Sequence, residues 1–151
     1  MRRESLSLLK KRLGRYKYRK KLAGFLERIF ELEPVAVILF GSLGRGDYLE
    51  DSDADVAVIL NEERVNTLKK IEELKEFDES GLIDIFPYGY EQFKGMIEDV
   101  NPFVFDILEG AVVFTGDERK LKDIVETMER VITCLLYTSD AADEGLGVDL
   151  G

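Results

Sequence analysis

The chain has 151 residues, of which 45% are hydrophobic and 34% charged, and its formal net charge is −10. This length and composition predict one globular domain with its own core. The absence of histidine and the presence of one cysteine, Cys134, exclude histidine-based catalysis, an internal disulfide and a cysteine-rich zinc site.

No targeting or membrane segment is evident in the sequence. No apolar run approaches the ~20 residues of a membrane span. The run at residues 5–9 is too short and too interrupted for the core of a signal peptide. We therefore expect a cytoplasmic protein with no membrane partner.

Residues 4–33 carry apolar side chains at the spacing of an amphipathic helix, which we expect as one helix or as two that meet near Gly14. The first 21 residues hold ten Lys and Arg against Glu4 alone, which leaves eleven basic and thirty acidic residues in the remainder. Such asymmetry is typical of a surface that meets nucleic acid or an acidic partner. A solvated helix face explains the same pattern, and both interpretations stay open.

Two apolar runs, at residues 35–40 and 56–60, predict buried strands. Asp53 and Asp55 stand at the opening of the second run. The two-residue period of a strand points both carboxylates to the same side. Two like charges held this close are costly unless a cation lies between them, so the pair predicts a divalent metal site.

The segment between the two runs carries groups that suit phosphate. Gly41 allows a sharp turn and a close approach of the backbone to a ligand. Ser42 offers a hydroxyl and opens a short helix whose amides favour phosphate, and Arg45 adds a planar fork of donors. Phosphate-binding groups beside paired carboxylates are what phosphoryl or nucleotidyl transfer requires.

The rest of the chain predicts further helices and strands in order. Asn61 is expected to cap a helix at residues 62–75. A strand at residues 82–86 contains Asp84 among apolar neighbours, and a lone carboxylate there must be paired, metal-bound or at the rim of the sheet. Given Asp53 and Asp55, we expect Asp84 to bind metal. A turn at residues 87–89 leads to helices at 90–100 and 102–109, a strand at 111–115 and a last helix at 118–132.

At this point the sequence resembles the polymerase-β-like nucleotidyltransferase superfamily, and in particular its minimal nucleotidyltransferases. Their signature GSxxRGxxxxxSDxDxxV is matched at every fixed position by Gly41, Ser42, Arg45, Gly46, Ser52, Asp53, Asp55 and Val58. The resemblance implies an α+β fold, a small mixed twisted β-sheet with helices packed on one face. Its catalytic groups would sit at one end of the sheet.

The resemblance also implies roles for the site residues. Asp53 and Asp55 would hold two Mg²⁺ ions, and Asp84 would bind the second ion and help to deprotonate the acceptor. The phosphates of ATP or another nucleoside triphosphate would be bound by Gly41, Ser42, Arg45 and Ser52.

The activity implied is metal-dependent transfer of a nucleoside monophosphate, AMP from ATP in the first instance, to an acceptor hydroxyl with release of pyrophosphate. Short members of this branch work beside a helical partner of the HEPN type, and several such pairs are toxin and antitoxin, so we expect the acceptor on a partner protein. The alternative is a catalytically weak antitoxin subunit that only neutralises such a partner. A homo-oligomer stays open, and a nucleic-acid partner is less favoured because the chain beyond the basic N-terminus is acidic.

Two simpler interpretations of the acidic motif explain fewer of its residues. An EF-hand calcium loop fits Asp51, Asp53, Asp55 and Glu62, but Val56 stands where that loop needs glycine. A solvated acidic turn explains any one of these residues, but not all of them in register with Asp84.

Residues 134–151 differ in character from the rest of the chain. They contain four acidic residues, no Lys or Arg, and no helical or strand period. The run at residues 134–144 back-translates into the adapter of transposase-based sequencing-library kits. We therefore predict a nucleotidyltransferase domain at residues 1–133, with a basic N-terminal helix at 1–33 and a catalytic core at 34–133, followed by a non-native tail at 134–151.

Overall fold

A four-stranded sheet with strand order β3-β2-β1-β4 forms the centre of the protein. The computed structural model describes the backbone of residues 1–150 and the side chains of residues 1–137. β1 pairs antiparallel with β2 and with β4, whereas β2 pairs parallel with β3. The strands are β1 (Ala36–Phe40), β2 (Ala54–Leu60), β3 (Ile83–Gly89) and β4 (Ala111–Phe114). This mixed sheet with its surrounding helices confirms the predicted α+β fold.

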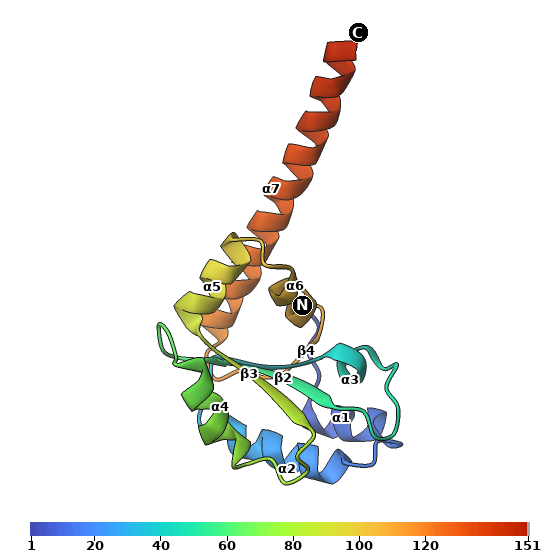
Figure 1. The fold of residues 1–151 in the computed structure, drawn as a ribbon, viewed down its shortest axis with the longest axis vertical. Coiled ribbons are helices and arrows are strands. Elements are labelled where there is room, and N and C mark those ends of the chain that lie inside the picture. The colour runs from blue at the N-terminus through green and yellow to red at the C-terminus, as the bar shows by residue number, and fades with distance from the viewer. Residues whose placement is uncertain (151) are drawn as a thin grey trace.

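Helices cover both faces of the sheet (Figure 1). One face packs against α1 (Leu6–Arg12), α2 (Arg19–Phe30) and α4 (Thr67–Lys75). The other face packs against α5 (Tyr90–Glu98), α6 (Pro102–Leu108) and the first part of α7 (Glu118–Leu150). The short helix α3 (Gly41–Arg45) directly follows β1 at one end of the sheet.

The expectation that helices pack on one face only is wrong, and the two central strands show why. β1 is buried at every position, and β2 at every position except Asp55. Because successive residues of a strand face opposite sides, strands buried throughout need cover on both faces. Accordingly, Val37 packs in the core with α1 and α2, whereas Ile38 packs in the core with α5 and α6.

The N-terminal region forms two helices rather than one, and residues 13–18 connect them. This is the second of the two arrangements expected from the sequence. The buried Tyr16 donates its hydroxyl to the Ser52 carbonyl at 2.7 Å. The Lys17 amide donates to the Glu50 carbonyl at 2.8 Å. The connection between α1 and α2 is therefore fastened to the loop that leads into Asp53.

Two arginines of the same region hold α3 in place. The Arg12 guanidinium donates to the Leu43 carbonyl at 2.7 Å and forms a two-fold contact with the Glu4 carboxylate, at 2.7 and 2.9 Å. Arg2 donates to the Gly44 carbonyl. These cations satisfy carbonyls near the C-terminal end of α3, where positive charge is favourable.

Two element boundaries differ from the sequence prediction. α4 begins at Thr67 rather than at residue 62, and its cap is Asn66, whose side chain accepts from the Lys69 amide at 3.2 Å. Residues 61–66 stay outside the helix because the Glu62 and Glu63 carbonyls accept from the amides of the next segment, at Tyr90 (2.7 Å) and Gln92 (3.0 Å). Those bonds replace the helical ones.

The prediction of a turn at residues 87–89 is also wrong, because β3 continues through Pro87 to Gly89. β3 is an edge strand, where a residue without an N–H group is tolerated.

α7 runs on from residue 132 to Leu150 and projects away from the sheet (Figure 1). The predicted non-native tail at residues 134–151 falls on this projection. Its side chains beyond residue 137, and residue 151 altogether, lie outside the described residues, so the tail and the domain boundary stay predictions. Within the described part of the chain, no helix combines the length and hydrophobicity needed to span a bilayer.

Asp78 organises the turn between α4 and β3, and its side chain has no exposed surface. One carboxylate oxygen accepts from the Ser80 amide and hydroxyl and from the Gly81 amide, at 2.7 to 3.1 Å. The other accepts from the Ile83 amide at 3.1 Å and pairs with the Lys75 ammonium at 3.0 Å. The hydrogen bonds from Ser80 and Lys75 outweigh burial and lower the pKa of Asp78. This network starts β3 one residue before Asp84.

We predict that Asp78→Ala lowers the free energy of unfolding at pH 7 by about 2–4 kcal/mol, because buried donors lose a charged acceptor. A lowered folded-state pKa stabilises the protein above the ordinary aspartate pKa of 3.8, and this stabilisation is lost as the pH falls through the folded-state value. The difference between the wild type and the variant should therefore shrink at acid pH. Urea denaturation at pH 7 and pH 3 measures it, with exposed Glu76→Ala as a near-neutral control. An equal difference at both pH values would contradict this assignment.

Candidate active site

Two carboxylates face each other across the parallel pair of strands. Asp55 on β2 is in register with Asp84 on β3, and Asp53 lies two residues before Asp55. Burial, the charges of Asp84 and Asp53 and a hydrogen bond with Asp84 raise the pKa of Asp55 to about 6, against a smaller opposing effect of Arg45. The sheet therefore sets Asp55 beside Asp84, and Asp53 lies close enough to act on the charge of Asp55.

Gly41 lies against Asp55 at a position where only glycine fits. Its φ is +68°, in the left-handed region, where a side chain strains the backbone. A Cβ atom at Gly41 would overlap the Asp55 carboxylate and lie 3.2 Å from its Cγ. The backbone just after β1 thus lies too close to the Asp55 carboxylate to leave room for a side chain at Gly41.

α3 sits directly on the end of β1 and carries Arg45 in its last turn. A Cβ atom at Gly44 would lie 2.7 Å from the Leu39 carbonyl oxygen, so this close packing also requires glycine. The exposed Arg45 guanidinium pairs with Asp47 at 3.3 Å and acts on the charge of Asp55. The Arg45 cation therefore lies close enough to the carboxylate pair to oppose the rise in the pKa of Asp55.

A cavity of about 270 Å³ opens over the end of β1 and the start of β2. Its lining includes the predicted residues Gly41, Arg45 and Asp55. The opposite wall comes from α6 and the turn after it, which contribute Phe103, Asp106, Glu109 and Gly110. The aromatic rings of Phe40, Phe86 and Phe103 lie 5.1 to 5.9 Å from one another beside this cavity.

The contribution of α6 to the cavity was not predicted from the sequence, which indicated only a helix at residues 102–109. The signal was present in the spacing, since Phe103 and Asp106 are three residues apart and therefore share one face of a helix. Val104 and Ile107 occupy another face and are buried in the core. That division leaves Phe103 and Asp106 for the cavity.

Four of the predicted site residues are not part of the cavity lining: Ser42, Ser52, Asp53 and Asp84. The Ser52 hydroxyl accepts from the Leu49 amide at 2.8 Å and so shapes the loop before Asp53. Ser42, half-buried in α3, accepts with its carbonyl from the Gly46 amide at 2.8 Å. Asp53 and Asp84 are exposed, close enough to Asp55 to raise its pKa by charge.

The donor atoms at this site suit a hard cation. Carboxylate oxygens are the ligands that Mg²⁺ prefers in proteins, and the repulsion between Asp55 and Asp84 is what a cation would relieve. Among the described residues, however, no three acidic, histidine or cysteine side chains converge closely enough to form a complete metal site. The pair of Asp55 and Asp84 therefore fits Mg²⁺, and Asp53 would complete the ligand set only by turning toward it.

We predict that Gly41→Ala lowers the free energy of unfolding by about 1–3 kcal/mol, because the new Cβ strains the backbone and overlaps the Asp55 carboxylate. Gly24→Ala is the matched control, since a Cβ there meets no atom within 4 Å. In the middle of α2 that change should stabilise the protein by about 0.5–1 kcal/mol. Urea denaturation compares the two, and a Gly41→Ala variant as stable as the wild type would contradict the tight contact.

Comparison with known proteins places the chain in a family. The model of the family described as "Nucleotidyltransferase domain" matches residues 19–127. A candidate nucleotidyltransferase from Sulfolobus solfataricus, known as a crystal structure, is 18% identical, with 70% of this chain and 85% of that chain covered at a TM-score of 0.49. No protein with curated function matches. Because the family model spans well over half of the sequence, the chain belongs to the nucleotidyltransferase domain family.

Proposed function

We propose that this chain transfers a nucleoside monophosphate, AMP from ATP in the first instance, to an acceptor hydroxyl and releases pyrophosphate. The observation that carries the proposal is the register that sets Asp55 opposite Asp84 with Gly41 against the Asp55 carboxylate. Asp55 and Asp84 supply negatively charged oxygen ligands for a cation, and Gly41 supplies a backbone without a side chain beside them. Membership of the nucleotidyltransferase domain family supports the same reaction.

In the proposed reaction the acceptor oxygen bonds to the α-phosphorus, and the bond from that phosphorus to the pyrophosphate oxygen breaks. Asp53, Asp55 and Asp84 would hold Mg²⁺, two ions by resemblance, which when bound supplies positive charge for the reacting oxygens. Gly41 lets the triphosphate approach the backbone, and Ser42, Arg45 and Ser52 bind its oxygens. The hydroxyl proton leaves toward the Asp84 carboxylate.

The acceptor we propose is a hydroxyl on a helical partner protein of the HEPN type, as in toxin–antitoxin pairs. This part of the proposal is supported by the unbroken motif from Gly41-Ser42 to Asp53-Ala54-Asp55. The exposure of Asp84 is compatible with an acceptor group carried by a large molecule, because that carboxylate is reachable from solvent.

We expect the full chain, with Mg²⁺ and α-³²P-labelled ATP, to label the protein encoded next to it in the source DNA. Asp53→Ala/Asp55→Ala should abolish labelling. Asp51→Ala, which removes an exposed acidic residue from the same loop, should retain it. The other three labelled nucleotides establish the preference for ATP. A partner that binds tightly but takes no label from any nucleotide would contradict transfer and assign the chain as a neutralising subunit.

A second prediction concerns Mg²⁺ and protein stability. At ten times its Kd, Mg²⁺ should stabilise the wild type by about 1.4 kcal/mol, and it should not stabilise Asp55→Asn. Thermal unfolding of both proteins measures this stabilisation, once with Mg²⁺ and once in EDTA as the metal-free reference. An equal Mg²⁺ response in the variant would contradict a role for Asp55 as a ligand.

Without Mg²⁺, Asp55→Asn should be more stable than the wild type at pH 7, by about 1 kcal/mol after solvent screening. The pKa of Asp55 is raised to about 6, so its charged form is disfavoured in the folded state. This penalty is fully present above pH 6 and absent below the ordinary aspartate pKa of 3.8. The advantage of the variant should therefore vanish as the pH falls from 7 to 4 in EDTA.

A further inference from the structure

A compact group of cations lies on the outer surface of α1 and α2. Two neighbouring hollows share Lys20 and Gly24 in their linings. One hollow adds Lys10 and Arg19, and the other adds Lys21 and Arg28. We call these five cations the α2 basic patch: Lys10, Arg19, Lys20, Lys21 and Arg28.

The charges of the patch are only weakly neutralised within the chain. Lys10 pairs with Glu27 at 3.7 Å and Arg28 with Glu79 at 3.3 Å, and all four side chains are about half exposed. Exposed pairs of this kind contribute roughly 0–1 kcal/mol and exchange readily for another anion. Arg19, Lys20 and Lys21 have no carboxylate within 4.0 Å among the described residues.

Arg19, Lys20 and Lys21 lower the stability of the helix that carries them. They stand at the start of α2, where the helix dipole disfavours positive charge, and the first turn contains no acidic residue. The cap residue, Tyr18, makes no side-chain hydrogen bond to the helix. Nothing within the described chain compensates for this arrangement, and such violations of local rules are expected where a surface serves a function.

The chemistry of the patch favours phosphates over a protein surface. Protein interfaces depend on buried aromatic and apolar anchors. None of the residues that line the two hollows is an exposed large hydrophobic side chain. Binding to a phosphate backbone requires only closely spaced cations and the release of counterions.

The patch also lies near the end of the sheet that carries the candidate active site. The turn between α1 and α2 is hydrogen-bonded to Glu50 and Ser52, on the loop that leads to Asp53. A strand bound along the start of α2 would therefore run beside that loop.

We propose that the α2 basic patch binds the phosphate backbone of a single-stranded nucleic acid. This inference rests on different residues from the proposed nucleotidyl transfer and does not depend on it. Arg19, Lys20 and Lys21 contact phosphates directly, and Lys10 and Arg28 exchange their carboxylate partners for phosphates. Five such contacts predict a slope of about −3.5 for the logarithm of affinity against the logarithm of salt concentration.

Fluorescence anisotropy of the full chain with a labelled, unstructured 20-nucleotide RNA tests the proposal. Affinity should fall by roughly 100-fold between 50 and 200 mM KCl. Lys20→Glu/Lys21→Glu should weaken binding at 50 mM KCl by more than about tenfold and flatten the salt dependence.

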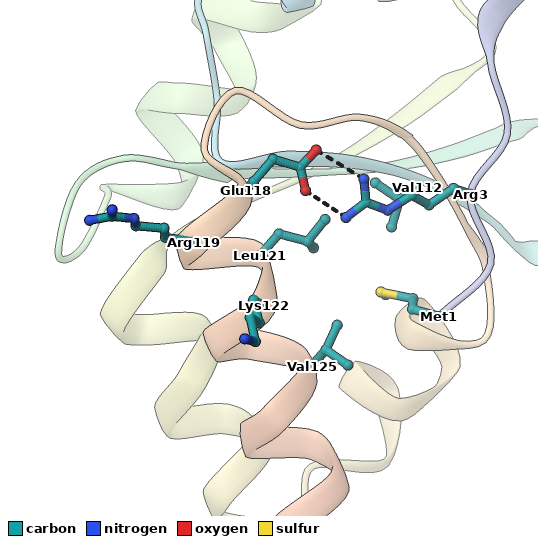
Figure 2. Close-up of a pocket in the computed structure, with 8 residues that line it drawn as sticks. All are labelled: Met1, Arg3, Val112, Glu118, Arg119, Leu121, Lys122 and Val125. Atoms are coloured by element: carbon teal, nitrogen blue, oxygen red, sulfur yellow. Dashed lines mark hydrogen bonds and ion pairs between the residues drawn. The ribbon is translucent and has the colours of Figure 1, made fainter.

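The matched control is Arg119→Glu/Lys122→Glu on α7, with the same change in formal charge. Both side chains are exposed and lie on the opposite face of the sheet, beside a hollow lined by Met1, Leu121 and Val125 (Figure 2). This control should bind RNA within about threefold of the wild type, since only non-specific charge is altered. Asp53→Ala/Asp55→Ala should bind RNA at least as well as the wild type, even if it transfers no nucleotide.

Three results would overturn the proposal: no RNA binding at 50 mM KCl, binding that is insensitive to salt, or an equal loss in the α7 control. A 20-residue poly-L-glutamate peptide serves as the second probe. If that peptide binds the patch and the RNA does not, the surface belongs to an acidic protein segment instead.

Discussion

The parallel pairing of β2 with β3 is the constraint on which the candidate site depends. Its register sets Asp55 beside Asp84, although two carboxylates at that position repel each other. The backbone hydrogen bonds of the pair and the burial of β1 and β2 on both faces hold this arrangement. A local electrostatic cost maintained by the surrounding fold is a recurrent property of sites that bind a cation or a charged substrate.

Around this pair, the site is built from elements that are distant in sequence. β1 is followed directly by Gly41, the first residue of α3, whose backbone conformation leaves room for the Asp55 carboxylate. α6, which packs on the same face of the sheet as α5 and α7, forms one wall of the cavity with Phe103 and Asp106. The N-terminal arginines hold α3 through its carbonyls, so a segment that contributes no lining residue still positions Arg45.

The motif residues and the strands that carry them were predictable from sequence because a glycine, an alternating acidic pair and two apolar runs have direct local meaning. Positions that depend on tertiary contacts were not. Residues 62–66 read as helix, but their carbonyls bond to the amides of Tyr90 and Gln92. The continuous burial of β1 and β2 decided that helices cover both faces, and an apolar run alone does not say which elements supply that cover. The role of α6 in the cavity likewise depends on how that helix is docked.

Pro87 lies in β3, the edge strand that also carries Asp84. Exposed edges of a sheet are templates for pairing with another chain, and a proline removes one of the donors that such pairing needs. A carboxylate at the start of the same strand adds charge that a neighbouring strand would have to desolvate. The two residues together disfavour pairing with another chain at the β3 edge, so the feature that keeps the site open to solvent also keeps the sheet from growing on that side.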